Sequence, residues 1–196
     1  MGGGIDLRLM ELSDTDDIIS WRNKPRVRNN FIYRKPFTRE GHHRWIENMI
    51  DTGKAVQFVI MENSTDKAIG STYLRDIDLD NRKAEFGIFI GVDEAVNRGY
   101  GTEACKLICN YGFEFLRLHR IFLRVFEWNL QAINSYKNAG FVREGLFRDD
   151  VCIDGEYHNI VIMGMLDNKP QGGTIHEKNF FNDCGGDDYA LSKRIC

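Results

Sequence analysis

Apolar and polar side chains alternate near the start of the chain, and this pattern predicts a strand over residues 5 to 11. Three further segments are rich in apolar and β-branched residues and are separated by short polar turns. These segments cover residues 56 to 62, 67 to 76 and 83 to 92. Because the connections between them are short, we expect three neighbouring antiparallel strands.

Two helices are predicted between the first strand and the second. Ser13 and Asp14 are typical N-cap residues for a helix that Pro25 ends, because the residue before a proline disfavours the helical conformation. A loop with basic and aromatic residues follows, and Thr38 caps a second helix that runs towards Asp51.

The second half of the chain alternates between helices and strands. From Thr102 onward, apolar residues recur with helical spacing and predict a helix that packs one face on a sheet. This apolar stripe consists of Ala104, Leu107, Ile108, Tyr111 and Phe115. Residues 120 to 126 form the fifth predicted strand, and because a helix separates it from the fourth, the two strands should run parallel.

The last predicted elements are a helix and a hairpin. The helix covers residues 130 to 139 and ends at Gly140, which favours a left-handed C-cap conformation. Residues 141 to 153 and 157 to 165 form a hairpin around an Asp-Gly turn. The order β-α-α-β-β-β-α-β-α-β-β predicts an α+β fold with a mixed, mostly antiparallel sheet and helices on both faces.

Length and composition limit the domain organisation. The chain has 196 residues, 42% of them hydrophobic, which suffices for one full core but not for two ordinary domains. We expect a single domain over residues 5 to 166. Between residues 167 and 196 the periodicity stops and Gly recurs, so a disordered tail is expected there.

The overall charge disfavours a nucleic-acid-binding protein. A net charge of −3 and a pI near 6.0 give no general basic field, so nucleic acid is not expected as a partner. The segment of residues 22 to 44, called the basic segment below, departs from this balance because its only acidic residue is Glu40. Its basic residues are Arg22, Lys24, Arg26, Arg28, Arg34, Lys35, Arg39 and Arg44. It either binds an anionic part of a substrate or forms a solvated charged face.

Neither the apolar runs nor the cysteines indicate a membrane protein or a metal protein. The sequence has no run of 18 apolar residues and no recognisable secretory signal, so we expect a cytoplasmic protein without membrane contact. The five cysteines lack metal-ligand spacing, and we expect free thiols and no metal.

Two motifs carry chemical information. The first is a glycine-rich turn at the start of a helix, made of Val96, Asn97, Arg98, Gly99, Tyr100, Gly101 and Thr102. Free backbone N–H groups and the positive end of the helix dipole make such a turn an anion site, and we expect it to bind phosphate. In the second motif, Asn129, Ala132 and Tyr136 share one face of the predicted helix.

At this spacing the two motifs resemble the signature motifs of the GNAT superfamily of acetyl-CoA-dependent N-acetyltransferases. The resemblance is strongest over residues 83 to 166. It departs from the family at Val96, where an Arg or Gln is usual, but a loop that binds through backbone amides tolerates this change. The resemblance implies an acetyl-CoA cosubstrate and a sheet whose fourth and fifth strands splay apart.

The resemblance also implies roles for individual residues. The loop over residues 96 to 102 would hold the pyrophosphate of CoA, with Arg98 reaching over it. The pantetheine arm would lie against the fourth strand and the following helix, at Phe89, Ile90, Gly91, Asn129, Ala132 and Ser135. Asn129 is equally well placed as a helix N-cap. Tyr136 would be the general acid, because a phenol with an ordinary pKa of about 10 keeps its proton at neutral pH.

The general base is open between three candidates. Glu85 on the fourth strand matches an acidic residue that several family members place beside the acceptor amine. Its alternative role is an outward-facing ion pair with Lys83 or Arg82. His158 on the last predicted strand, with two acidic residues near it, is the second candidate, and water is the third.

The acceptor side resembles one branch of the family. Trp21, Arg22 and Asn23, with His43 and Trp45 further on, are similar to the branch that contains ribosomal-protein N-terminal, polyamine and nucleotide-amino-sugar acetyltransferases. These residues favour an amino sugar as acceptor, with a protein N-terminus as the other candidate. The basic segment could contact a nucleotide diphosphate, and its charge disfavours a cationic polyamine. The candidate substrate-binding residues are Trp21, Arg22, Arg28 and His158.

The resulting hypothesis is acetyl transfer to a primary amine by direct attack in a ternary complex, by a protein that we expect to be a homodimer. The alternative is a catalytically silent acyl-CoA-binding regulatory module, which the retention of Tyr136 and Glu85 disfavours. A scaffold or a nucleic-acid binder has only the basic segment in its support.

Overall fold

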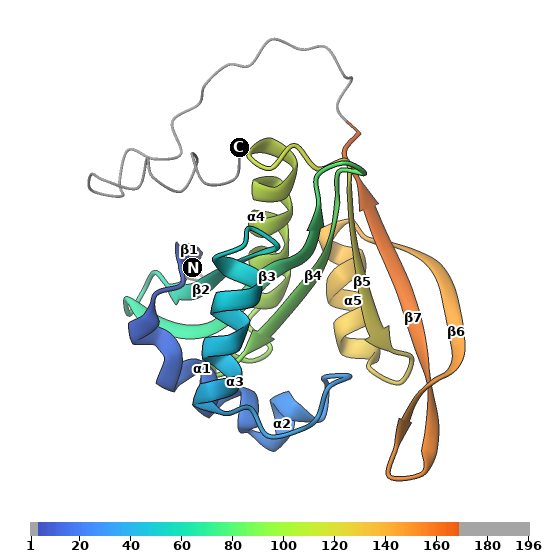
Figure 1. Ribbon diagram of the computed structural model, residues 1–196, viewed down its shortest axis with the longest axis horizontal. Coiled ribbons are helices and arrows are strands. Elements are labelled where there is room, and N and C mark those ends of the chain that lie inside the picture. Colours follow the sequence, from blue (N-terminus) through green and yellow to red (C-terminus); the bar gives the residue numbers. More distant parts are fainter. Residues whose placement is uncertain (1–3, 169–196) are drawn as a thin grey trace.

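The structure, a computed structural model, describes residues 4 to 168, and over this range its centre is a seven-stranded sheet. The strands are β1 (Ile5–Leu9), β2 (Ala55–Glu62), β3 (Lys67–Asp78), β4 (Lys83–Ile90), β5 (Arg120–Phe126), β6 (Val142–Ile153) and β7 (Glu156–Leu166). They lie side by side in the order β1-β2-β3-β4-β5-β7-β6 (Figure 1). Only β4 and β5 pair in parallel within this sheet; the other pairs are antiparallel.

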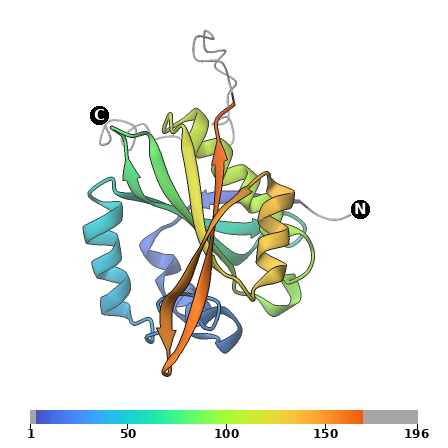
Figure 2. The ribbon, with the colours of Figure 1, turned by 90° about the vertical axis from the view of Figure 1, so that its right-hand side faces the viewer.

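Helices cover both faces of this sheet. They are α1 (Thr15–Asn23), α2 (Pro25–Arg28), α3 (Arg39–Trp45), α4 (Tyr100–Glu114) and α5 (Leu130–Ala139), with short helical turns η1 (Leu12–Asp14), η2 (Ile46–Ile50) and η3 (Asp93–Ala95). In Figure 2, α3 lies on one side of the sheet, and α4 and α5 lie on the other. The predicted fold class is therefore confirmed. The predicted tail falls on residues outside the described range, apart from its first two.

The caps predicted for α3 and α5 are present in the structure. The Thr38 hydroxyl accepts a hydrogen bond from the Gly41 N–H at 3.1 Å and so caps α3. Gly140 ends α5 with a φ of 115°, the left-handed conformation that glycine adopts at little cost.

The predicted loop after α1 contains a further short helix, α4 begins earlier than predicted, and β1 and β4 each end two residues earlier than predicted. Helix α1 ends at Asn23 as predicted, because Lys24 before Pro25 takes an extended ψ of 132°, but Pro25 then begins the short helix α2 within the predicted loop. The first turn of a helix needs no donor from its first residue, so a proline fits there. Helix α4 begins at Tyr100, two residues earlier than predicted, because Gly99 takes a φ of 84° and becomes its N-cap.

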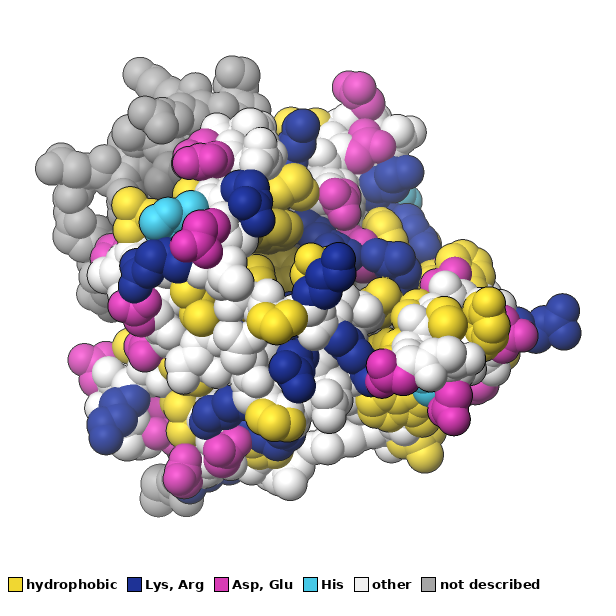
Figure 3. Space-filling model, turned by 60° about the horizontal axis from the view of Figure 1, so that its bottom comes forward, with side chains coloured by type: hydrophobic (Ala, Val, Ile, Leu, Met, Phe, Trp, Pro, Cys, Tyr) yellow, Lys and Arg dark blue, Asp and Glu magenta, His cyan; other side chains and the backbone are white. Residues whose placement is uncertain are grey.

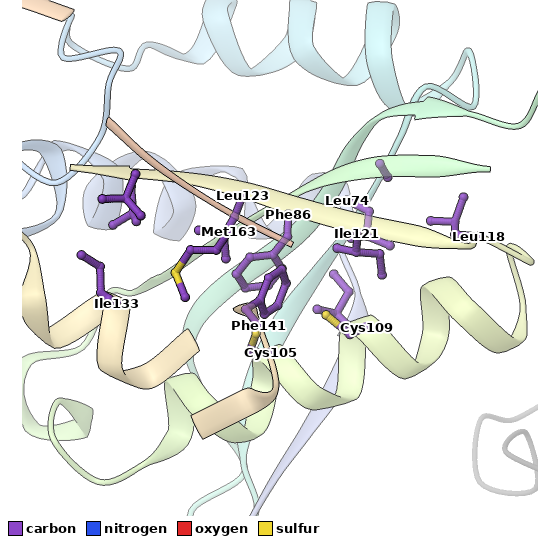
Figure 4. Close-up of a cluster of buried hydrophobic side chains, with 14 of the residues drawn as sticks. Leu74, Phe86, Cys105, Cys109, Leu118, Ile121, Leu123, Ile133, Phe141 and Met163 are labelled. Carbon is purple, nitrogen blue, oxygen red and sulfur yellow. The ribbon is translucent and has the colours of Figure 1, made fainter. Parts of the chain in front are cut away.

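The main core lies between the sheet and α4 (Figure 4). Leu74, Phe86 and Met163 point from the strands towards Cys105 and Cys109 on α4. Both thiols are free and buried, and they fill space as small apolar side chains do. In the predicted apolar stripe on α4, Ala104 and Ile108 are buried, Leu107 and Tyr111 are partly buried, and Phe115 is 44% exposed.

The pairing of β4 with β5 is short, so the two strands separate over most of their length. The two strands pair only from Lys83 to Glu85 and from Arg120 to Phe122. Beyond these residues they separate, as the family resemblance implied, although each strand continues to its own end at Ile90 and Phe126. Among the described residues, no helix is long and apolar enough to cross a membrane.

Candidate active site

A cavity of about 820 Å³ lies where β4 and β5 separate. Its wall includes the diverging parts of both strands, the loop before α4, one face of α5 and side chains from α1, α2 and α3. Figure 3 shows a hollow in this region, with hydrophobic side chains in its wall and Lys and Arg side chains beside it.

The cavity reaches both faces of the sheet. Successive side chains of a strand point to opposite faces, so Glu85 and Gly87 on β4 belong to one face and Phe86 to the other. Tyr73, which packs on Gly87, also touches Trp45 from α3, whereas Phe86 touches Tyr136 from α5. The gap between the strands therefore joins a space on the α3 side to a space on the α5 side.

The loop before α4 forms a backbone cradle on the cavity wall. Asn97 and Gly99 both have positive φ angles, 64° and 84°, which turn the chain sharply into the helix. The N–H groups of Thr102 and Glu103 donate back to the Gly99 carbonyl, so the amides that remain for a ligand are those of residues 97 to 101.

The space beside this loop fits a phosphate group. A Cβ atom added to Gly99 would meet nothing within 4 Å, and one added to Gly101 would meet only the Ser135 hydroxyl at 3.9 Å. Oriented amides, the positive end of the α4 dipole and open space together are what a pyrophosphate requires. The residues present therefore fit CoA.

Two side chains of the loop contact Glu62, which does not line the cavity. The Tyr100 hydroxyl donates to Glu62 Oε1 at 2.7 Å, and Arg98 Nη1 lies 3.3 Å from the same oxygen. Arg98, predicted to reach over the loop, is paired with this buried carboxylate and does not line the cavity, so its contact with CoA stays a prediction. Val96, Asn97, Gly99, Tyr100, Gly101 and Thr102 do line the cavity.

Helix α5 supplies the opposite wall. The Asn129 side chain accepts a hydrogen bond from the Ala132 N–H at 3.1 Å, so its role as N-cap is confirmed. Its amide also donates to Asn30 Oδ1 at 2.9 Å. The hydroxyls of Ser135 and Thr102 lie 2.8 Å apart and connect α5 to the first turn of α4. Asn129, Ala132 and Ser135 all line the cavity.

Tyr136 projects into an aromatic environment on this wall. Its ring packs edge-on against Phe86, with centroids 5.7 Å apart, and lies 6.2 Å from the ring of Phe141. Burial among these rings raises the pKa of the Tyr136 phenol well above its ordinary value. The phenol therefore stays protonated at neutral pH, as a proton donor must.

Glu85 lies on the α3 side of the gap and is held by two arginines. Arg75 Nη2 donates to its Oε2 and Arg124 Nε donates to its Oε1, each at 3.0 Å. The ion pair that the sequence suggested with Lys83 or Arg82 does not form. Lys83 is paired with Asp78 instead.

Three cavity residues on β3 and β5 were missed by the sequence analysis. Tyr73 and Arg75 share a face of β3, and register places them opposite Gly87 and Glu85, while Arg124 comes from β5. Burial raises the pKa of the Tyr73 phenol. The only signal in the sequence was the two-residue spacing of Tyr73 and Arg75, which by itself indicates no more than a shared face.

Arg22 closes the cavity near the end of α1. Its guanidinium stacks 3.4 Å from the centroid of the Phe31 ring. Its Nη1 atom is buried and has no hydrogen-bond partner among the described residues. Burial lowers the pKa of the Arg22 guanidinium.

The other substrate-binding candidates do not line the cavity. Trp21 is buried against Phe89 and against Gly91, where an added Cβ would lie 2.0 Å from the indole ring. Gly91 is thus required for packing; Phe89 and Ile90 line the cavity, but Gly91 does not. Arg28 also lies off the wall. His158 borders a different depression, with Trp128 and Asn159, so it is not on the wall that holds Tyr136.

A metal site is not formed by the described part of the chain, where no three His, Cys, Asp or Glu side chains are grouped suitably for an ion. The polar groups on the cavity wall include amides, hydroxyls, phenols, guanidinium groups and the Glu85 carboxylate. These groups suit the binding of an anionic cosubstrate and the movement of protons.

Comparisons with known proteins agree with this geometry. The family model of the acetyltransferase (GNAT) domain matches residues 5–142. The N-acetyltransferase p20 of Bacillus licheniformis is 31% identical over 166 residues, which cover 83% of this chain and 92% of that protein. The spermidine N-acetyltransferase of Vibrio cholerae, solved in complex with CoA and spermine, superposes with a TM-score of 0.76 at 26% identity. The match covers 83% of this chain and 95% of that one.

A further structure of the Vibrio cholerae enzyme is described as dodecameric; it has a TM-score of 0.69 and 26% identity over 83% of this chain and 93% of that one. Four observations support one assignment. The family model matches most of the chain, and a relative is similar over most of its length. In the structure, β4 and β5 separate, and backbone amides form a cradle before α4. The chain belongs to the GNAT family and is an acetyl-CoA-dependent N-acetyltransferase.

Proposed function

We propose that the chain transfers the acetyl group to a primary amine by direct attack within a ternary complex, in one domain over residues 5 to 166. The observation that carries this proposal is the gap between β4 and β5, which connects the space beside Tyr136 to the space beside Glu85. An amine on the α3 side and a thioester on the α5 side would meet in this gap.

Cosubstrate binding is assigned to the loop and the diverging strands. The amides of residues 97 to 101 hold the pyrophosphate, and the edge of β4 at Phe89 and Ile90 lies along the pantetheine arm. Asn129, Ala132 and Ser135 line the other side. Acetyl-CoA supplies the thioester carbonyl, which is the electrophile of the reaction.

Tyr136 and Glu85 divide the proton transfers between them. A new N–C bond forms as the C–S bond breaks; the amine loses a proton to Glu85 through water, and the departing sulfur receives one from Tyr136. The raised pKa of Tyr136 suits the donor role. In this proposal Arg75 and Arg124 hold Glu85 in position, while its remaining oxygen lone pairs accept the water.

The acceptor is assigned to the branch that takes amino sugars or protein N-termini. A polyamine is the competing acceptor, because the Vibrio cholerae relative is a spermidine N-acetyltransferase and its structure contains spermine. However, Glu85 is the only carboxylate among the described residues of the cavity wall, and both of its oxygens are occupied by arginine donors. A polyamine with several positive charges would find no free carboxylate there.

A thiol-release assay tests the function. Acetyl-CoA is incubated with single amines from a panel of amino sugars, short peptides and polyamines, and free thiol is measured with the protein and with its Tyr136→Phe variant. Acetyl transfer predicts release that depends on both amine and Tyr136. A silent binding module would bind CoA, seen as a higher melting temperature, and release no thiol with any amine.

We also propose that the protein assembles with copies of itself through the hairpin of β6 and β7. Strand β6 is the last strand of the sheet, and the hairpin exposes Val142, Phe147 and Tyr157 at 66%, 52% and 67%. An open strand edge with exposed apolar side chains favours association. Analytical sedimentation measures the oligomeric state of the protein and of a Phe147→Lys variant, and a monomer in both cases contradicts this proposal.

A cytoplasmic location stays a prediction.

A further inference from the structure

An excess of positive charge surrounds the acceptor side of the cavity. The charged side chains on the wall, within the described range, are Arg22, Arg26, Arg75, Arg124 and Glu85. Arg26 is neutralised by Asp93, whose carboxylate lies 2.7 Å from its Nη2. Arg75 and Arg124 both pair with Glu85, and Arg75 Nε also lies 3.6 Å from Asp76 Oδ2, so of these wall arginines only Arg22 has no carboxylate partner among the described residues.

Strand register brings these groups to one place. Arg75 lies opposite Glu85, and Tyr73 lies opposite Gly87 on the same face of the sheet. The nearby charges of Arg75, Arg22 and Arg124 lower the pKa of the Tyr73 phenol, although burial outweighs them. Arg22, Arg75, Arg124 and Tyr73 all line the same cavity.

Arg22 lacks the counter-ion that a buried cation requires. Its guanidinium is held by the faces of Phe31 and Phe37 rather than by a carboxylate, and no salt bridge to it is formed within residues 4 to 168. A guanidinium has five N–H donors, and leaving a buried one unpaired is costly. Arg75 uses Nη2 for Glu85 and Nε for Asp76, and Arg124 uses Nε and Nη2 for Glu85, so the Nη1 group of each remains for a ligand.

We propose that the acceptor amine carries an anionic oxygen group, a carboxylate or a phosphate, which Arg22 binds together with the free donors of Arg75 and Arg124. This inference rests on the proposed function, because it names the class of acceptor. A planar carboxylate and a phosphate both match the guanidinium fork. The same positive charge favours the neutral form of the nearby amine, which is the nucleophile.

Matched pairs of amines test this proposal on the unmodified protein. Glycylglycine is compared with glycylglycinamide, and O-phosphoethanolamine with ethanolamine, with spermidine as a fifth acceptor. We expect kcat/KM to be at least tenfold higher for the anionic member of one pair, and the favoured pair distinguishes carboxylate from phosphate. Equal rates within both pairs, or a preference for spermidine, would overturn the inference.

The variant Arg22→Gln gives the second arm. It should remove the preference for the anionic member while leaving the KM for acetyl-CoA unchanged, and the control Arg44→Gln, on the exposed side of α3, should keep the preference. A preference that survives in Arg22→Gln contradicts the assignment. If no amine in a broad panel causes thiol release, the proposed function fails; release without a charge preference fails this inference alone.

Discussion

The Tyr100 hydroxyl donates a hydrogen bond to Glu62 Oε1 at 2.7 Å, which ties the start of α4 to the end of β2. Glu62 also accepts from Thr65 at 2.7 Å and pairs with Arg98, and these hydrogen bonds lower the pKa of its carboxyl group. One buried carboxylate thus fixes the loop that presents its amides to the cavity, although it does not itself line the cavity.

Glu62→Gln is therefore expected to weaken CoA binding. The loop loses a charge-assisted anchor, and we expect the Kd for CoA to rise roughly tenfold, about the worth of one hydrogen bond to a charged group. Calorimetric titration with CoA measures this. The milder Tyr100→Phe should give a smaller increase, and an unchanged Kd in both variants would show that the loop is held without Glu62.

Gly101→Val should fill the cradle while leaving the fold intact. A side chain there occupies the space beside Ser135, and we expect CoA affinity to fall roughly tenfold or more. In the unmodified protein, CoA at about a hundredfold excess over its Kd should add about 2.7 kcal/mol of stability. Thermal unfolding with and without CoA measures the stabilisation in the unmodified protein and its loss in Gly101→Val. Gly145→Val on β6 is the control. A normal CoA-dependent shift in Gly101→Val would exclude this loop as the phosphate site.

Tyr136→Phe should lower kcat by roughly a hundredfold with little change in CoA affinity, because only a proton donor is lost. The control variant Tyr111→Phe alters a phenol on α4 that packs against Phe58 on β2, and this variant should keep its activity. The raised pKa of Tyr136 also predicts that kcat does not decline through ionisation of this phenol below about pH 10. Full activity in Tyr136→Phe would move the acid role to water.

Glu85→Gln should reduce kcat/KM most at low pH, where the acceptor amine is mostly protonated and most needs a base. Pre-steady-state and steady-state rates between pH 6 and 9 would show a deficit that shrinks as pH rises. A deficit of equal size at every pH would instead give Glu85 the role of positioning Arg75 and Arg124.

His42 should make the fold sensitive to acid. Its ring is fully buried, one nitrogen lies 3.1 Å from the Thr15 hydroxyl, and burial lowers the pKa of His42 from 6.5 to about 4. The unfolded chain binds a proton more readily, so stability present above pH 6.5 declines as pH falls towards 4, by up to about 1.4 kcal/mol per pH unit.

Denaturant unfolding at pH 7.5 and pH 5 measures this loss. The neighbouring His43 is exposed, so His43→Gln should retain the pH dependence. His42→Gln should reduce it, even if the variant is less stable at both values. The same pH dependence in His42→Gln would assign the effect to other groups.

Local sequence determined the elements and the cosubstrate loop. A glycine turn before a helix, Asn129 before α5 and Gly140 after it act through hydrogen bonds and φ angles within one turn, so the residues at hand suffice to predict them. The alternation of helix and strand around β5 likewise fixed the parallel pair with β4. The family motifs then indicated the cosubstrate.

Tertiary structure decided which side chains meet. Arg75, Glu85 and Arg124 come from three strands, and only the register of β3, β4 and β5 brings them together. Arg98 pairs with Glu62, 36 residues away in sequence. His158 belongs to a different depression from Tyr136. A side chain takes its partner from whichever element packs beside it, and the residues next to it in sequence do not specify that element.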